Sequence, residues 1–221
     1  VVMGGSWGAT LALAYAEQFP DKVLGLILRG VFLARQQDLD WLYHDGTRKI
    51  FPDHWQEFIH PIPESERDNL LEAFNRRLVG EDEIARMTAA KAWSLWEAKV
   101  ATLEPSKEVV EQLGAPHTAL SMARISAHYF VNQCFLKENQ LLDNAHKLEG
   151  IPGIIVHGRY DMICPIENAW ALQNKWPNCE LHIIRDAGHA GSEAGIVDGL
   201  VRATKEMFQE LSHDCSDPTS S

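Results

Sequence analysis

The sequence contains few cysteines, and their arrangement excludes several kinds of protein. The four are Cys134, Cys164, Cys179 and Cys215. They form no CxxC pair and have no histidine beside them at zinc-finger spacing, so the pattern favours reduced thiols over disulfides or a structural zinc site. No basic segment followed by an apolar one begins the chain, which predicts that a secretory signal is absent. We therefore expect a cytoplasmic protein.

Long apolar runs and clusters of positive charge are also missing. The longest apolar stretch, residues 23–28, is interrupted by Gly25 and is far shorter than the roughly 20 residues that a membrane helix requires. The formal net charge is -11, with acidic and basic residues interspersed, so no basic surface is expected that could neutralise a row of phosphates. We expect neither a membrane nor a nucleic acid as a partner, and the sequence does not indicate the oligomeric state.

What the sequence does contain is the composition of a globular protein, with strands and helices alternating at both ends of its 221 residues. Nearly continuous apolar runs bounded by turn residues predict strands covered on both faces, and helical periodicity follows them. The first predicted strand ends at residue 3, and the other three span 22–30, 151–157 and 180–185. The predicted helices span 6–18, 165–175 with Pro165 in the first turn, and 192–211 with Ser192 as N-cap. This alternation predicts an α/β fold with a mostly parallel sheet flanked by helices.

The middle of the chain has a different character. Residues 32–146 show helical periodicity, many tryptophans and no convincing β-branched run, with helices expected over 63–78, 82–103, 106–113, 115–134 and 139–148. We interpret 32–146 as a helical insertion, 1–31 with 147–213 as the α/β core, and 214–221 as a flexible tail.

A short glycine-rich motif supplies a candidate nucleophile. Gly4-Gly5-Ser6-Trp7-Gly8 matches G-x-S-x-G, in which a serine occupies a sharp turn between a strand and a helix. An apolar strand end precedes the motif here and a helix rich in small residues follows it, as the motif requires. Ser6 is therefore the predicted nucleophile, and the backbone N–H of Trp7 is a predicted donor to the oxyanion.

A serine nucleophile needs a base and an acid that orients the base. Asp161 and His189 each follow a late predicted strand, and the carboxyl ends of parallel strands share one edge of a sheet. His157, at a strand end, is the rival base, and Asp186, three residues before His189, is the rival acid. The order Ser, Asp, His favours Asp161 and His189. The second oxyanion donor should lie in a loop after an earlier strand, and this chain contains no such loop. We therefore expect the early strands of the fold to be absent from this chain.

Longer segments resemble one family over nearly the whole chain. They include GGSWGATLALAYAEQFPDKVLGLILRGVF, WLYHDG, FPDHW, AAKAWSLWE, ISAHYF, PGIIVHGRYDMICP and AWALQNKWPNCELHIIRDAGH, and together they resemble the proline iminopeptidases (prolyl aminopeptidases) of the α/β-hydrolase superfamily. The resemblance implies a serine exopeptidase that releases N-terminal proline from small peptides through an acyl-enzyme, without a metal or cofactor. It also implies a helical cap formed by the insertion, and the absence here of roughly the first third of the protein, including an HGGPG-type loop.

The same resemblance assigns roles to particular residues. It implies that Glu97 binds the α-ammonium group of the substrate. It also implies that four residues form an apolar proline pocket: Phe32, Tyr43, Phe130 and Cys164.

One motif departs from the family pattern. Where the family usually reads IENHYF this chain reads ISAHYF, so Ser126 replaces a second ammonium-binding glutamate and Ala127 its neighbour. A serine supplies no charge, which predicts weaker selection for a free amino terminus. Ala190 replaces a common serine after His189.

Two alternatives to a proline-releasing exopeptidase stay open. One is another amidase or esterase of this superfamily acting on small substrates, and the other is a catalytically incomplete fragment.

Overall fold

The computed structural model describes residues 1–214. These residues form two compact units. The sheet unit contains Val1–Leu33 and the chain from Asn139 onward, and the helical unit contains Ala34–Glu138. Every helix within the described residues is too short or too polar to cross a lipid bilayer.

Four parallel strands form the sheet of the first unit. They are β1 (Val2–Gly5), β2 (Leu26–Arg29), β3 (Gly153–Gly158) and β4 (Cys179–Ile184), in that order across the sheet. Each pair is parallel, with Gly5 opposite Arg29 and Arg29 opposite Val156. All four strands therefore end at the same edge, and the α/β fold expected from the sequence is confirmed.

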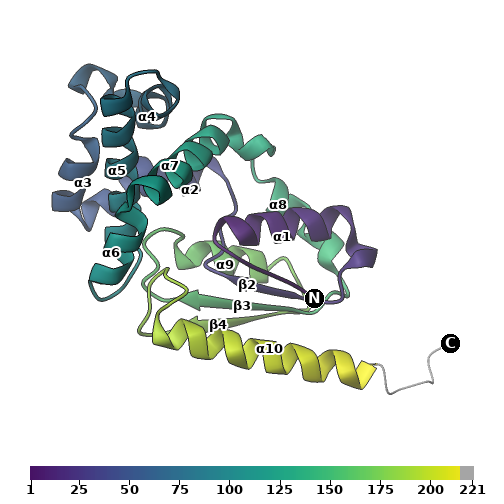
Figure 1. The fold of residues 1–221 in the computed structure, drawn as a ribbon. Helices are drawn as coiled ribbons and strands as arrows, with labels where there is room; N and C mark the ends of the chain where they lie inside the picture. The colour runs from purple at the N-terminus through teal and green to yellow at the C-terminus, as the bar shows by residue number, and fades with distance from the viewer. Residues whose placement is uncertain (215–221) are drawn as a thin grey trace. The chain divides into compact units, whose positions relative to one another are not determined.

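Helices cover both faces of this sheet (Figure 1). On one face lie α1 (Trp7–Gln18) and α9 (Ile166–Gln173), and on the other lies α10 (Ala194–Asp214). Small residues of α1, among them Ala9, Ala12 and Ala16, are buried, so the helix packs closely on the strands as its composition predicts. The core beneath α10 joins strand residues to helix residues: Ile27, Ile154, Val156, Ile184, Ile196, Ala203 and Met207.

Several boundaries differ from the sequence-based expectation. The strand predicted over 22–30 begins only at Leu26, because a 3-10 turn, Pro20–Lys22, follows α1. The last helix begins at Ala194, so Glu193 rather than Ser192 precedes its first residue. Pro165 is the N-cap of α9 and not a residue of its first turn. In each case, residues that periodicity alone assigned to a strand or helix lie outside it, in the preceding turn or cap.

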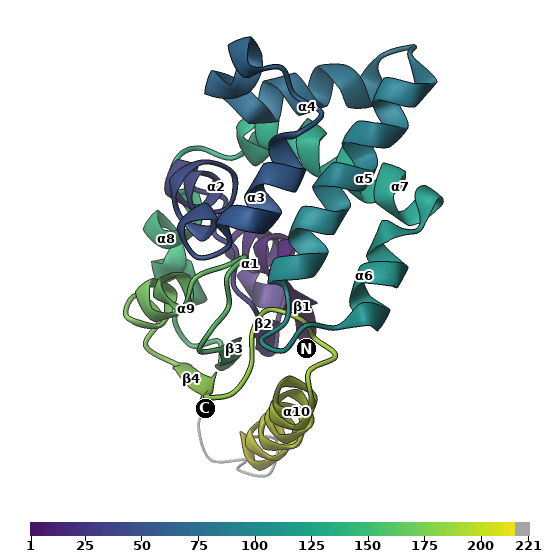
Figure 2. The same ribbon diagram turned by 90° about the vertical axis from the view of Figure 1, so that its left-hand side faces the viewer.

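The second unit is entirely helical. Its α-helices are α2 (Gln36–Asp40), α3 (Pro52–Ile59), α4 (Leu70–Val79), α5 (Glu83–Val100), α6 (Lys107–Gly114) and α7 (Pro116–Val131). A π-helical turn, Trp41–Asp45, follows α2. Helix α5 is central, with α3, α4, α6 and α7 packed around it (Figure 2). Buried aromatic rings fill the space between these helices, including stacked Phe58 and Phe74 with centroids 4.6 Å apart.

The insertion also differs in detail from the expectation. Helix α3 was not predicted, although Pro52 at its start and buried Trp55, Phe58 and Ile59 provide a helical signal. The helix expected over 139–148 forms two short pieces, α8 (Gln140–Asp143) and a 3-10 turn, Ala145–Leu148, and both belong to the sheet unit. The two units thus divide at 33/34 and 138/139, compared with the predicted borders at 31/32 and 146/147. The predicted tail, 214–221, lies outside the described residues except at its first position.

Candidate active site

Three side chains from distant parts of the chain meet at the carboxyl edge of the sheet. Ser6 directly follows β1, Asp161 follows β3, and His189 follows β4. His189 is 8% exposed and Asp161 is 3% exposed. The distances are 3.0 Å between Ser6 Oγ and His189 Nε2, and 2.8 Å between His189 Nδ1 and Asp161 Oδ2. The structure therefore brings the three predicted residues into one hydrogen-bonded chain.

The backbone at Ser6 has the sharp turn that the motif predicts. Its φ is 56° and its ψ is -122°, a left-handed conformation that is unfavourable for a residue with a side chain. The Ser6 N–H donates to Arg29 O at 2.8 Å, and Ser6 O accepts from Ala9 N at 2.9 Å. A side chain at Gly4 could not fit, because its Cβ would lie 2.2 Å from Gly8 O. These contacts hold the strained turn between β1 and α1.

The hydrogen bonds of His189 identify its tautomer. A carboxylate can only accept, so Nδ1 carries the proton that His189 donates to Asp161. The opposite nitrogen, Nε2, is then an acceptor for the Ser6 hydroxyl. This is the arrangement in which an imidazole can take a proton from serine.

Asp161 is held as a buried carboxylate. Burial alone would raise the pKa of Asp161, but the electrostatic attraction of His189 and the hydrogen bond from His189 outweigh it and hold the pKa below its ordinary value. The other oxygen, Oδ1, accepts backbone N–H bonds from Ile163 at 3.0 Å and Cys164 at 2.8 Å. Asp161 is thereby kept charged and fixed in orientation. The rival acid, Asp186, is exposed.

His157, the rival base, is fully buried, and its Nε2 lies 3.5 Å from Asp161 Oδ2. Its Nδ1 accepts the Val31 N–H at 3.3 Å, and its Nε2 lies 2.8 Å from Cys164 O, to which it donates. Burial lowers the pKa of His157, although the nearby Asp161 charge partly opposes this. Both ring nitrogens are thus engaged by backbone groups, and the neutral ring braces the loop that carries Asp161.

Three further predicted residues belong to the sheet unit. Trp7 is the first residue of α1, so its N–H belongs to the first turn, where helical N–H groups point out of the helix. Its ring contacts Phe32, with centroids 6.3 Å apart. The Phe32 carbonyl accepts a hydrogen bond from Thr10 Oγ1 at 2.7 Å. Cys164 is 1% exposed, and its backbone links Asp161 to His157.

In the helical unit, the carboxylate of Glu97 and three aromatic side chains form a cluster. Glu97 Oε1 accepts hydrogen bonds from Tyr43 Oη at 2.5 Å and from Trp93 Nε1 at 2.7 Å. The ring of Tyr43 lies 4.7 Å from that of Trp93 and 5.6 Å from that of Phe130. Ser126 lies on α7 one helical turn before Phe130, and is partly exposed. The cluster places a carboxylate among aromatic rings, which is an arrangement suited to binding an organic cation.

Sequence reasoning did not assign roles to Trp93 or Arg29. Trp93 precedes Glu97 by four residues on α5, a spacing that puts two side chains on one face of a helix. That spacing could have identified it. Arg29 contacts His189 through its side chain, and no local pattern indicates a contact over such a separation.

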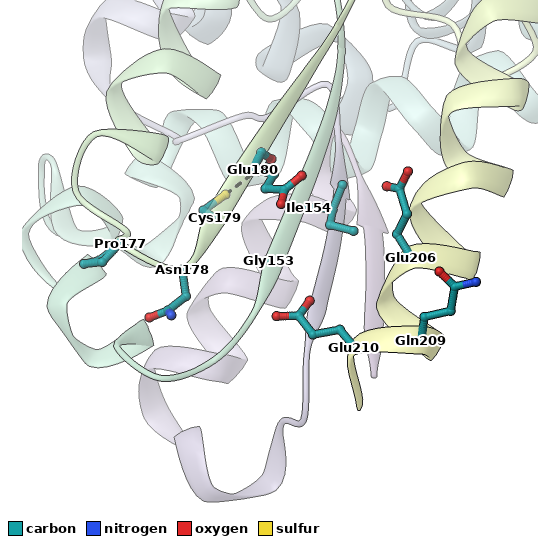
Figure 3. A pocket seen from close by; sticks show the side chains of 9 residues that line it. All are labelled: Gly153, Ile154, Pro177, Asn178, Cys179, Glu180, Glu206, Gln209 and Glu210. Carbon is teal, nitrogen blue, oxygen red and sulfur yellow. Dashed lines mark hydrogen bonds between the residues drawn. The ribbon is translucent and has the colours of Figure 1, made fainter. Parts of the chain in front are cut away.

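One cavity in the sheet unit lies away from these residues. It has a volume of about 490 Å³ and lies where β3 and β4 begin, at Gly153 and Cys179, with Glu206 and Glu210 of α10 beside it (Figure 3). Since Ser6 lies at the edge where the strands end, this cavity is at the opposite end of the sheet. Among the described residues, no group of three or more His, Cys, Asp or Glu side chains is arranged to hold a metal ion.

Comparison with known proteins agrees with this geometry. Residues 1–195 match the family model described as alpha/beta hydrolase fold. The chain is 49% identical over 204 residues to a proline iminopeptidase of Xylella fastidiosa, covering 92% of this chain and 65% of that protein. It is 42% identical over 213 residues to a proline iminopeptidase of Neisseria meningitidis, covering 96% of this chain and 67% of that protein.

The solved structures support the same fold. An esterase from Exiguobacterium antarcticum superposes with a TM-score of 0.58 at 18% identity, over 93% of this chain and 65% of the esterase. At that identity the likeness concerns the fold alone.

The chain spans about two thirds of the length of the curated relatives it matches. It belongs to the α/β-hydrolase fold family and, within that family, to the group of the proline iminopeptidases.

Proposed function

We propose that the protein containing this chain is a serine exopeptidase that releases N-terminal proline from small peptides. The observation that carries the proposal is the hydrogen-bonded chain from Ser6 through His189 to Asp161. The identity of 49% to a relative named proline iminopeptidase supports the choice of substrate. A cytoplasmic location remains a prediction from the sequence.

In the proposed reaction, Ser6 Oγ attacks the carbonyl carbon of the N-terminal prolyl residue. His189 Nε2 takes the hydroxyl proton as the Oγ–C bond forms, and Asp161 stabilises the resulting imidazolium. The carbon–nitrogen bond then breaks, and His189 returns the proton to the leaving amine. Water, deprotonated by the same imidazole, cleaves the prolyl ester and regenerates Ser6. These steps use side chains of the chain alone, so we propose that no metal or cofactor takes part.

The tetrahedral intermediates in this reaction carry a negative oxygen. We propose the Trp7 N–H as one donor to that oxygen, because Trp7 is the first residue of α1 and immediately follows the nucleophile. The positive end of the α1 dipole favours the same charge. Phe32 and Cys164 are proposed as the part of the proline pocket that the sheet unit supplies.

We propose that the helical unit supplies recognition of the free amino terminus through Glu97. Tyr43 and Trp93 orient one oxygen of this carboxylate, and hydrogen bonds between charged groups are roughly twice as strong as neutral ones. Tyr43 and Phe130 are proposed as its contribution to the proline pocket. At the second family position Ser126 has no charge, which favours the alternative of a less selective amidase or esterase.

Three chromogenic substrates separate these functions. Prolyl, alanyl and N-acetylprolyl p-nitroanilides are compared on the protein that contains this chain, with Ser6→Ala as the inactive control. We expect the prolyl compound to be cleaved with the highest kcat/KM and the N-acetylprolyl compound not to be cleaved. Equal cleavage of the acetylated and free compounds would instead identify the amidase alternative.

A further inference from the structure

Arg29 is the last residue of β2 and lies between the strands that carry the nucleophile and the acid. Its register partners are Gly5 on β1 and Val156 on β3. The Arg29 carbonyl accepts the N–H of Ser6 at 2.8 Å. The backbone of this residue therefore already contributes to the strained turn at the nucleophile.

The side chain of the same residue reaches the loop that carries the base. Arg29 Nη1 donates to His189 O at 2.9 Å and lies 3.3 Å from His189 Nε2. The guanidinium group is half-buried, and a hydrogen bond from a charged donor to a partly buried carbonyl is stronger than one between neutral groups. Arg29 thus contacts both the turn at Ser6 and the loop at His189.

The contact with Nε2 constrains the proton on the ring. A guanidinium has only donors and stays charged in proteins, so Arg29 can form a hydrogen bond with Nε2 only when that nitrogen has no proton. Asp161 imposes the same tautomer from the other side of the ring by accepting from Nδ1. When Nε2 receives the serine proton this longer contact must break, while the shorter bond to His189 O can remain.

The chain leaves space for the guanidinium at Gly5. A Cβ at Gly5 would lie 2.5 Å from Arg29 Nη2, whereas a Cβ at Gly191 would lie 3.7 Å from Arg29 Nε, an ordinary van der Waals contact. Gly5 occupies a variable position of the G-x-S-x-G motif, so the motif itself does not require glycine there. A side chain at this position would instead displace the guanidinium.

We propose that Arg29 is a positioning residue for the nucleophile and its base. Its carbonyl fixes the turn at Ser6. Its guanidinium fixes the loop that carries His189 and favours the His189 tautomer that accepts the Ser6 proton. The proposal rests on the serine mechanism proposed above. It does not depend on proline as the substrate.

The test measures how fast Ser6 is labelled by a fluorophosphonate, which reacts with activated serines and carries neither a proline ring nor an amino group. Arg29→Ala is expected to label about 10- to 100-fold more slowly, the range for losing a charged hydrogen bond, with little change in melting temperature. Added guanidinium at millimolar concentration should restore part of the rate, whereas urea, its neutral counterpart, should not. Gly5→Ala, which displaces the guanidinium while Arg29 is retained, should slow labelling as well.

Controls separate this role from general destabilisation. Arg202→Met removes an exposed arginine of α10 that pairs with Asp198 and should label at the wild-type rate. If Arg29→Ala does not fold, Arg29→Lys decides: labelling slowed several-fold at an unchanged melting temperature supports the proposal. Wild-type labelling of a folded Arg29 variant, or a loss that guanidinium leaves unrestored, would overturn it. Normal labelling without cleavage of prolyl substrates would contradict the proposed substrate and leave the role of Arg29 intact.

Discussion

Replacing Glu17 should make the protein more stable at neutral and alkaline pH. Glu17 lies near the end of α1, is 5% exposed, and its Oε1 has no hydrogen-bond partner among the described residues. Burial raises the pKa of this carboxyl from 4.5 to about 8, although a hydrogen bond with Asn144 and the charge of Lys147 partly oppose it. The folded protein therefore retains a proton on Glu17 over a pH range in which the unfolded chain has lost it.

The sign of the effect follows from proton linkage. Below pH 4.5 both states are protonated and Glu17 carries no penalty. Between 4.5 and about 8 the unfolded state binds fewer protons, so the free energy of unfolding falls as the pH rises, and above about 8 the loss levels off. At about 1.4 kcal/mol per pH unit, the loss at pH 7 has an upper bound of about 3.4 kcal/mol. Relaxation of the surrounding structure reduces this to about 1–2 kcal/mol.

Glu17→Gln keeps the shape of the side chain and removes its ionisation. We expect the variant and the parent to be equally stable near pH 4.5, and the variant to gain about 1–2 kcal/mol by pH 7. Urea unfolding followed by tryptophan fluorescence from pH 4.5 to 9 measures the difference. Glu210→Gln, at an exposed position on α10, provides the control and should show a constant difference. A Glu17→Gln difference that does not depend on pH would refute the reasoning.

Three further substitutions test the site. Trp93→Phe keeps an aromatic ring but removes the donor to Glu97, so KM for prolyl anilides should rise about tenfold with kcat nearly unchanged; a matching loss in kcat would contradict this role. Gly4→Ala places a Cβ 2.2 Å from Gly8 O, so both fluorophosphonate labelling and the melting temperature should fall, and wild-type values would show that the turn tolerates the methyl group. Ser126→Glu adds a carboxylate at the family's second ammonium-binding position and should lower KM for prolyl anilides about tenfold; an unchanged KM would count against it.

The parts of the fold that the sequence predicted are those determined by local pattern. Buried parallel strands read as continuous apolar runs, which is why β2 and β3 were identified. The strand-to-helix turn at Ser6 was found because its glycines and flanking elements are contiguous. Asp161 and His189 were selected because each follows a strand, and parallel strands end at one edge.

The boundaries of short elements were less predictable, because they depend on what packs against them. The segment 139–148 has helical periodicity, yet it breaks at Asn144 into α8 and a 3-10 turn. Both pieces pack on α1 rather than within the helical unit. Periodicity reports which residues are buried, but it does not report the partner that buries them.

The contacts of Arg29 depend on strand register, which a single sequence does not specify. Successive residues of a strand point to opposite faces, so a shift of one residue between β1 and β2 would turn Arg29 away from the face that it now shares with Ile27. Ile27 packs beneath α10 in the core, and this apolar burial fixes the register. The same packing therefore sets the direction of a charged side chain two residues later, and through it the contact with His189, which lies 160 residues further along the chain. A core substitution such as Ile27→Ala should accordingly loosen the loop that carries His189 as well as lower the stability of the fold. It would do so without altering any residue that touches His189.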